Sequence, residues 1–313
     1  MLNYLLRRSL AAVPVLILVS LLSFGIIWLV PGDPTAAFVD ASASPEQLAR
    51  LRHELGLDVP LWSRMLHWYG RILTGDMGHS ILLNRSVFDA LSERLPVTLS
   101  LAGLALAMAV VLGTGAGIVA AMRRGTRTDQ TVMSLALMGL SVPDFWLGLV
   151  LIVTFAVGLG WLPSGGYVPI GDSVSGWLAS MAMPALTLAL VQMGFIARMT
   201  RSAMLDVLHQ DFVRTADAKG LSHGYVVLRH ALPNAMMPIL TVIGIIAGSL
   251  LGGAVVVEQV FSLPGVGRLI IGAIMSRDFP VIQGGLLFLA LIYLAINLGV
   301  DLLYAAVDPR VRP

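Results

Sequence analysis

The sequence predicts an all-helical protein that crosses a membrane six times. Hydrophobic residues make up 57% of its 313 residues and charged residues only 12%, whereas about a quarter of an ordinary water-soluble domain is charged. The mean hydropathy is +0.85. A helix needs roughly 20 apolar residues to cross a bilayer core of about 30 Å. Six runs meet or approach that length: Leu10 to Val30, Val97 to Met122, Thr131 to Leu159, Leu178 to Ala197, Ala235 to Val257 and Val281 to Tyr304.

Residues 1–30 form the N-terminal tail and the first span. Arg7 and Arg8 before an apolar run resemble the charged start of a secretory or twin-arginine signal. The apolar stretch of a cleaved signal is typically about 7–15 residues long, whereas the run from Leu10 to Val30 has twenty-one. We therefore expect an uncleaved first span.

The short connections predict the orientation. Arginines precede the first span, join spans two and three, and end the chain in the tail of residues 305–313, whereas the connection from Gly160 to Trp177 has no Lys or Arg. By the positive-inside rule, both termini are cytoplasmic. Residues 31–96 are then an extracytoplasmic cap, and their arginines do not conflict with this because long loops translocate regardless of charge. Within the cap, the stretch from Gln47 to Leu55 predicts an amphipathic surface helix.

Several functional classes are poorly supported. Twenty basic residues nearly balance eighteen acidic ones, so nucleic acid is not an expected partner. Cysteine is absent and the six histidines lack ligand spacing, so neither a disulfide nor a metal site is expected. No serine lies in a nucleophile-elbow sequence, which argues against a hydrolase.

The core of residues 97–304 carries few polar groups within or near its spans. They are Asp144, Gln192, Glu258, Asn297 and Asp301. Because a charge facing lipid is costly, these groups should face protein, a water-filled path or an interface. They form no chain of ionisable groups through the spans, so an ion-coupled carrier has little support. A carrier, and a receptor or channel, remain the alternatives.

Two glycine patterns predict close helix packing. Gly113-Thr-Gly-Ala-Gly117 lies inside an apolar run with no strand before it, so it is not a nucleotide-binding loop. Gly244, Gly248 and Gly252 recur every four residues and form a smooth stripe that lets another helix approach. Packing within the chain and packing against another subunit both remain open for this stripe.

A charged segment, residues 198–235, interrupts the apolar runs. Gly220 and Pro233 predict a short helix ended by the glycine and a second helix stopped near the proline. Such a compact pair of polar helices between two spans is suited to docking a soluble partner. A basic anchor on anionic lipid is the alternative.

The chain's only lysine, Lys219, is followed by Gly220 and not by the hydroxyl residue of a phosphate-binding loop. ATP must therefore bind another polypeptide if transport is ATP-driven.

The charged segment resembles the coupling motif of importer-type ABC transporter permeases, written E-A-A, three residues, Gly, nine residues, I-x-L-P. Aligned on Gly220, Arg214-Thr215-Ala216 replaces the first triplet, His230 replaces the Ile, and Leu232-Pro233 matches the end. These replacements are typical of the peptide and nickel permease family. Further stretches resemble the first permease subunit of that family: Pro31-Gly-Asp-Pro34, Gly56-Leu-Asp-x-Pro60, Gly75-Asp-Met-Gly78, Arg94-Leu-Pro-x-Thr98, Arg198-Met-Thr-Arg-Ser202, Glu258-x-x-Phe261, Pro264-Gly-Val-Gly267, Arg277-Asp-Phe-Pro-Val-Ile-Gln283 and Asp308-Pro-Arg310.

The resemblance implies a type I ABC importer permease fold in the bacterial cytoplasmic (inner) membrane. It implies a second homologous permease, two ATPase subunits and an extracytoplasmic substrate-binding protein as partners. It assigns no cofactor to this chain, because ATP and Mg would bind the ATPases.

Peptides are the first expected substrate, glutathione the second, and nickel or a metal chelate the third. The expected ATPase-coupling residues are Asp211, Arg214, Thr215, Ala216, Ala218, Lys219, Gly220, Leu232 and Pro233.

Overall fold

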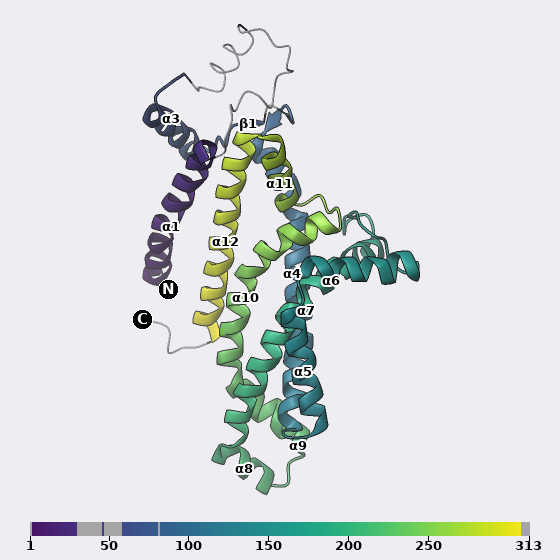
Figure 1. Ribbon diagram of the computed structural model, residues 1–313. Coiled ribbons are helices and arrows are strands. Elements are labelled where there is room, and N and C mark those ends of the chain that lie inside the picture. Colours follow the sequence, from purple (N-terminus) through teal and green to yellow (C-terminus); the bar gives the residue numbers. More distant parts are fainter. Residues whose placement is uncertain (1, 30–45, 47–57, 81, 308–313) are drawn as a thin grey trace. The chain divides into compact units, whose positions relative to one another are not determined.

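The structure is a computed structural model that describes residues 2–29, 46, 58–80 and 82–307 (Figure 1). The chain divides into two compact units. Of the described residues, those at 97–267 and 295–307 form one unit, and those before residue 97 together with 268–294 form the other. Two long helices, α4 (Val87–Met122) and α12 (Phe279–Val307), contribute to both units.

The first unit is a helical bundle arranged around α7 (Val174–Leu208), which packs against α5, α6 and α10. Its remaining elements follow in chain order: α5 (Arg127–Ser141), α6 (Asp144–Leu151), the π-helix η2 (Ile152–Gly158), α8 (Asp211–Ala218), α9 (His223–Tyr225), the π-helix η3 (Val226–Ala231) and α10 (Leu232–Val260). The helices are longer than the apolar runs that predicted them because polar turns extend them at their ends.

Glycines permit the closest helix contacts of this unit. A Cβ atom at Gly113 of α4 would lie 2.9 Å from the Cβ of Ile196 in α7, and one at Gly117 would lie 2.5 Å from the Cβ of Thr200. Likewise, a Cβ at Gly194 of α7 would overlap the carbonyl oxygen of Ala136 in α5. The prediction that Gly113 and Gly117 are packing positions is confirmed.

The run from Thr131 to Leu159, predicted as one span, is divided into two helices by a sharp bend. The axes of α5 and α6 differ by 105°. The break lies at Val142 and Pro143, where Val142 has extended dihedral angles (φ −91°, ψ 125°). A proline disfavours the helical conformation in the residue before it and cannot donate a backbone hydrogen bond. The sequence is apolar on both sides of the short stretch from Ser141 to Asp144, so a hydropathy average over the whole run suggested a single helix.

The second unit contains α1 (Leu2–Leu29), α3 (Leu61–Leu73), a two-stranded hairpin, the first turns of α4, most of α11 (Val266–Ser276) and the first part of α12. The hairpin strands β1 (His79–Ser80) and β2 (Arg85–Ser86) are antiparallel, with His79 opposite Ser86. Phe24, Trp68 and Leu287 form a buried cluster that holds α1, α3 and α12 together. The amphipathic helix predicted from Gln47 to Leu55 lies outside the described residues, and α3 and α11 were not predicted.

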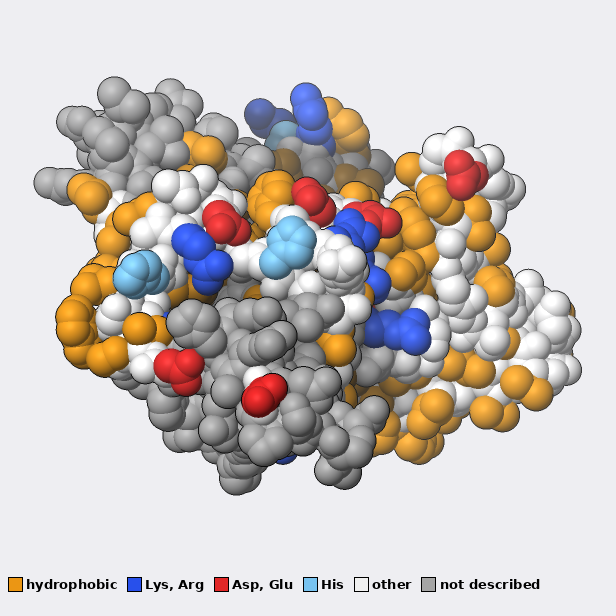
Figure 2. Space-filling view, turned by 90° about the horizontal axis from the view of Figure 1, so that it is seen from above, with side chains coloured by type: hydrophobic (Ala, Val, Ile, Leu, Met, Phe, Trp, Pro, Cys, Tyr) orange, Lys and Arg blue, Asp and Glu red, His pale blue; other side chains and the backbone are white. Residues whose placement is uncertain are grey.

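Four of the described helices are long and apolar enough to cross a membrane, or five if the bent α5–α6 pair counts as one span. The apolar part of α1, Leu10–Gly25, is shorter. Large apolar side chains are exposed along these helices, including Leu22, Met138, Val157 and Ile245. Figure 2 shows hydrophobic side chains over wide areas of the surface on this face, with charged side chains and histidines gathered mainly over its central part. Such a surface suits a protein surrounded by lipid.

Candidate functional site

The charged segment folds into a helical corner at one end of α7 and α10 (Figure 1). Helix α8 ends at Ala218, Lys219 caps it, and Gly220 follows with φ +80°. Glycine adopts this left-handed conformation at no steric cost. The chain then turns through Leu221 and Ser222 into α9. The predicted helix ending at Gly220 is therefore confirmed.

The inner face of this corner is anchored in a hydrophobic cluster. Val213 and Ala216 of α8 are buried with Val226 and Val227 of η3. The same cluster contains buried residues from the three long helices around it: Ala121 of α4, Met204 and Val207 of α7, and Ala235 and Ile239 of α10. Since close-packed interiors transmit displacement, the corner should move together with the ends of these helices.

The outer face presents apolar and charged side chains to solvent. Phe212, Leu221, Tyr225 and Leu228 are 40%, 39%, 51% and 60% exposed. Among the predicted coupling residues, Asp211, Arg214, Thr215, Ala218, Lys219, Gly220 and Pro233 are exposed, Leu232 is half-buried and Ala216 is buried. The sequence analysis did not single out the four apolar residues, although they occupy the same segment.

The prediction that the second helix stops near Pro233 is wrong. Residues His223–Val260 form one continuous helix of 38 residues. The π-helical turns of η3 lie directly before Pro233, where the chain has to accommodate a residue without an N–H group. The side-chain amide of Asn234 donates a 2.7 Å hydrogen bond to the carbonyl oxygen of His230. The wider turns of η3 accommodate the proline within the continuous helix.

An ion pair joins the start of α5 to α7 near the corner. The Nε and Nη2 atoms of Arg201 donate to the two carboxylate oxygens of Asp129 at 2.6 and 2.7 Å. Asp129 also accepts a hydrogen bond from the backbone N–H of Gly125 at 2.9 Å. Its side chain is only 5% exposed. This bidentate contact fixes the α4–α5 connection against α7.

A second polar contact in the same unit lies within the core. The hydroxyl of Thr98 donates a 2.6 Å hydrogen bond to Oε1 of Glu258, whose side chain is fully buried. The backbone N–H of Val266 donates to the same hydroxyl at 2.9 Å. A Cβ atom at Gly265 would overlap the Glu258 carboxylate. Three of the recognised sequence motifs, at residues 94–98, 258–261 and 264–267, thus meet at one place.

No group of three or more His, Asp or Glu side chains that could hold a metal ion occurs within the part of the chain that the structure describes. The features that the described residues do present at this corner are an exposed face with apolar and charged side chains and, on its inner side, a buried hydrophobic cluster.

Comparison with known proteins gives the family. The sequence profile described as the inner membrane component of binding-protein-dependent transport systems matches residues 113–313, and the profile of the N-terminal part of such components matches residues 1–102. The chain belongs to this family. The permease is accordingly a transport subunit of an ABC system and not an enzyme, and the ATPase is a separate subunit.

Curated relatives match the permease over nearly its whole length. A putative peptide transport system permease protein of Brucella abortus is 50% identical over 98% of both chains. A dipeptide transport system permease protein, DppB, of Alkalihalophilus pseudofirmus is 41% identical over 100% of both chains. A glutathione transport system permease protein, GsiC, of Escherichia coli is 42% identical over 100% of this chain and 99% of its own.

Among solved structures, a chain of the MetNI methionine ABC transporter in an inward-facing conformation has a TM-score of 0.58 at 20% identity. The match covers 71% of the permease and 97% of that chain. At this identity the likeness concerns the fold alone. The family also implies ATPase subunits, a second permease and a substrate-binding protein as the partners of this inner-membrane component.

The glycine stripe of the permease has two different environments. Gly244 and Gly248 are buried, whereas Gly252 is exposed and a Cβ there would meet no atom within 4 Å. Packing within the chain accounts for burial at the first two positions. Because the side of α10 at Gly252 is open, packing of another subunit against this position remains a prediction.

Proposed function

We propose that this permease is the first permease subunit of an ATP-driven peptide importer that works by alternating access. It would have six spans, with both termini and the docking corner (residues 211–233) in the cytoplasm and residues 31–96 outside. Its partners would be a second homologous permease, two ATPases and an extracytoplasmic binding protein. Three relatives with peptide, dipeptide and glutathione permease names, at 41–50% identity over 98% or more of this chain, support this assignment.

The proposed alternating-access mechanism rests on one structural observation. The docking corner exposes Phe212, Tyr225 and Leu228 on one side, while its other side shares one buried cluster with α4, α7 and α10. An ATPase that holds the exposed side and moves when it binds ATP would displace the corner as a rigid body. The shared cluster would pass this displacement to the long helices, and alternating access requires such rigid-body motion.

Glutathione is the second candidate substrate, because the relative named GsiC is as similar as the relative named DppB. Glutathione is itself a short peptide with free carboxylate groups. The two candidates therefore share one ligand chemistry and differ in the linkage and size of the peptide.

The test is reconstitution of the permease in lipid with its companion permease, ATPases and binding protein. We expect peptide to stimulate ATP hydrolysis and ATP to drive peptide uptake. Gly220→Asp changes the tip of the docking corner and should abolish the stimulation, with insertion unchanged. Arg214→Glu should do the same, because it reverses an exposed charge on α8.

Gly160→Asp is the matched control for Gly220→Asp. Both glycines have positive φ, at +64° and +80°, and both have open space at the Cβ position. The backbone strain of the two substitutions is therefore similar, and only Gly220 lies in the docking corner. Normal coupling in both the Gly220 and Arg214 variants would refute the assignment of the corner, and peptide uptake without ATPases would refute the importer itself.

A further inference from the structure

We propose that a pocket in the second unit receives a short peptide and holds it by its terminal carboxylate. The pocket has a volume of about 450 Å³ and lies between the β1–β2 connection, the start of α4, and helices α11 and α12. The inference rests on the proposed function and names a site for its substrate. Pockets for small ligands typically measure about 300–1,000 Å³, so a dipeptide or tripeptide fits this volume.

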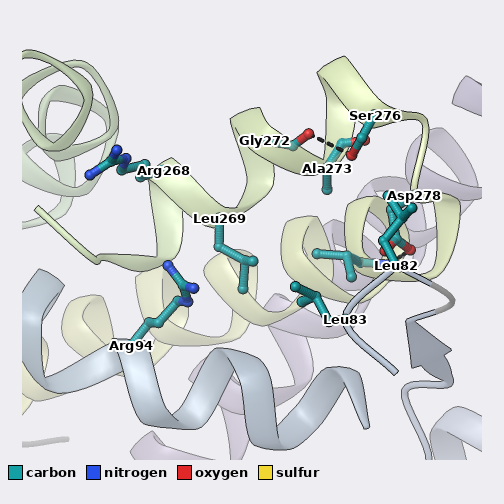
Figure 3. Close-up of a pocket in the computed structure, with 10 residues that line it drawn as sticks. Leu82, Leu83, Arg94, Arg268, Leu269, Gly272, Ala273, Ser276 and Asp278 are labelled. Atoms are coloured by element: carbon teal, nitrogen blue, oxygen red, sulfur yellow. Dashed lines mark hydrogen bonds between the residues drawn. The ribbon is translucent and has the colours of Figure 1, made fainter. Parts of the chain in front are cut away.

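The lining of the pocket is polar at both ends and apolar between them. Figure 3 shows Arg94 and Arg268 at one end, and Ser276 and Asp278 at the other, with Leu269 and Leu83 between. A free peptide has the same order of chemical groups. It carries a carboxylate at one end, an ammonium at the other, and side chains in between.

The basic end suits a carboxylate. Arg94 comes from the first turns of α4 and Arg268 from the start of α11, and both residues line this end of the pocket. In Figure 3 the Arg94 guanidinium lies beside Leu269, whereas the Arg268 side chain extends outward, so Arg94 is the group placed to meet a carboxylate. A guanidinium presents its N–H donors in a planar fork that matches the two oxygens of a carboxylate.

The acidic end suits an ammonium. The Asp278 carboxylate accepts hydrogen bonds from the Ser80 hydroxyl at 2.5 Å and from the Val281 N–H at 3.5 Å. A carboxylate has about four acceptor positions, so it retains capacity for a further donor. The Ser276 hydroxyl donates to the carbonyl oxygen of Gly272 at 2.8 Å, which leaves its own oxygen as an acceptor.

The placement of the pocket gives it a role in transport. Most of its lining comes from residues 82–94 and 268–276, which lie outside the four long apolar helices or at their polar starts. In the proposed orientation this is the extracytoplasmic side. A peptide released by the binding protein would be held there before it enters the path through the membrane.

The experiment measures peptide binding to the reconstituted transporter without its binding protein. Calorimetric titration compares Leu-Leu with its C-terminal amide and with its N-acetyl derivative. We expect the amide to bind about tenfold more weakly or worse, because it lacks the charge that Arg94 would hold. The N-acetyl derivative should also bind more weakly, because it lacks the ammonium.

Arg94→Gln should abolish the difference between the free acid and the amide, and Arg94→Lys should retain part of it. Arg85→Gln is the matched control, because Arg85 lies in the same unit, pairs with Glu93 at 2.7 Å and does not line the pocket. Equal binding of acid and amide to the unaltered protein would overturn the proposal, and so would normal discrimination in a folded Arg94→Gln variant.

The outcome is separable from that of the proposed function. If the unaltered complex imports peptides with ATP but shows no carboxylate preference at the permease, only the pocket assignment fails. If peptide binds with the expected preference but ATP drives no uptake, the importer assignment fails and the pocket assignment stands.

Discussion

Thr98 and Glu258 are 160 positions apart in the sequence, and the hydroxyl of one donates a 2.6 Å hydrogen bond to the carboxylate of the other. The Thr98 oxygen also accepts the N–H of Val266 at 2.9 Å. The hydroxyl thus serves as donor and acceptor at once, and it connects α10 and the start of α11 to α4. A buried carboxylate is costly unless it is hydrogen-bonded, so this contact explains how Glu258 is tolerated in an apolar core.

Thr98→Val should destabilise the permease by about 1–3 kcal/mol, because the isosteric side chain leaves both the Glu258 carboxylate and the Val266 N–H short of a partner. The measurement is thermal unfolding of the purified protein in detergent. Thr241→Val is the control: Thr241 is exposed on α10, and its hydroxyl bonds only the carbonyl oxygen of Met237 in its own helix, at 3.0 Å. Equal effects of the two substitutions would contradict a structural role for the Thr98 contact.

Two glycines that lie two residues apart in α4 should respond in opposite ways to the same substitution. Gly117→Ala places a Cβ 2.5 Å from the Cβ of Thr200, so α4 and α7 must separate, at a cost of about 1–3 kcal/mol. Gly115→Ala meets no atom within 4 Å, and alanine favours helix by up to about 1 kcal/mol. Unfolding of both variants in one detergent checks the prediction, which fails if Gly117→Ala is as stable as Gly115→Ala.

The sequence was sufficient to predict features that depend on neighbouring residues. The apolar runs predicted the long helices, Gly220 predicted the end of α8, and the glycines at 113 and 117 predicted close packing. Each of these signals is local, because it reflects helix length, a positive φ or a missing side chain.

The sequence could not predict features that depend on distant partners or on small deviations from a regular helix. The run across Pro143 is apolar on both sides, so its composition did not reveal the 105° bend. Pro233 suggested a helix end, but the π-helix before it lets the helix continue. Helix α11 has 11 residues, too few to be recognised as a span. The contact between Thr98 and Glu258 requires the folded chain, although both belong to recognised motifs.

The Asp129–Arg201 pair should contribute measurably to stability. Asp129→Asn and Arg201→Gln should each lower the free energy of unfolding by about 1.5–3 kcal/mol, because the carboxylate is buried and the contact is bidentate. A double-mutant cycle isolates the pairwise energy. The exposed Arg85–Glu93 pair, whose side chains are 42% and 68% exposed, is the control and should give about 1 kcal/mol or less. A coupling energy near zero for Asp129 and Arg201 would show that the two residues stabilise the fold independently.

Two adjacent residues of α8 should separate docking from folding. Phe212 is 40% exposed and Val213 is 2% exposed, and both are apolar. Phe212→Ser should lower the melting temperature of the permease less than Val213→Ser does, because 40% of Phe212 already lies in solvent, but it should lower peptide-stimulated ATP hydrolysis of the assembled transporter if an ATPase covers this face. Val213→Ser should lower the melting temperature, because it leaves a cavity and a hydroxyl in the buried cluster, at a cost of about 1–3 kcal/mol.

The two readouts decide the role of the α8 surface. If Phe212→Ser leaves coupling intact in an assembly that contains all its subunits, the exposed apolar face is not the contact through which the ATPase acts. If it impairs coupling only together with a loss of stability equal to that of Val213→Ser, the residue belongs to the core and the docking surface lies elsewhere. A loss of coupling with little loss of stability would support a partner bound to the outer face of the docking corner, because the buried cluster behind that face would still be intact.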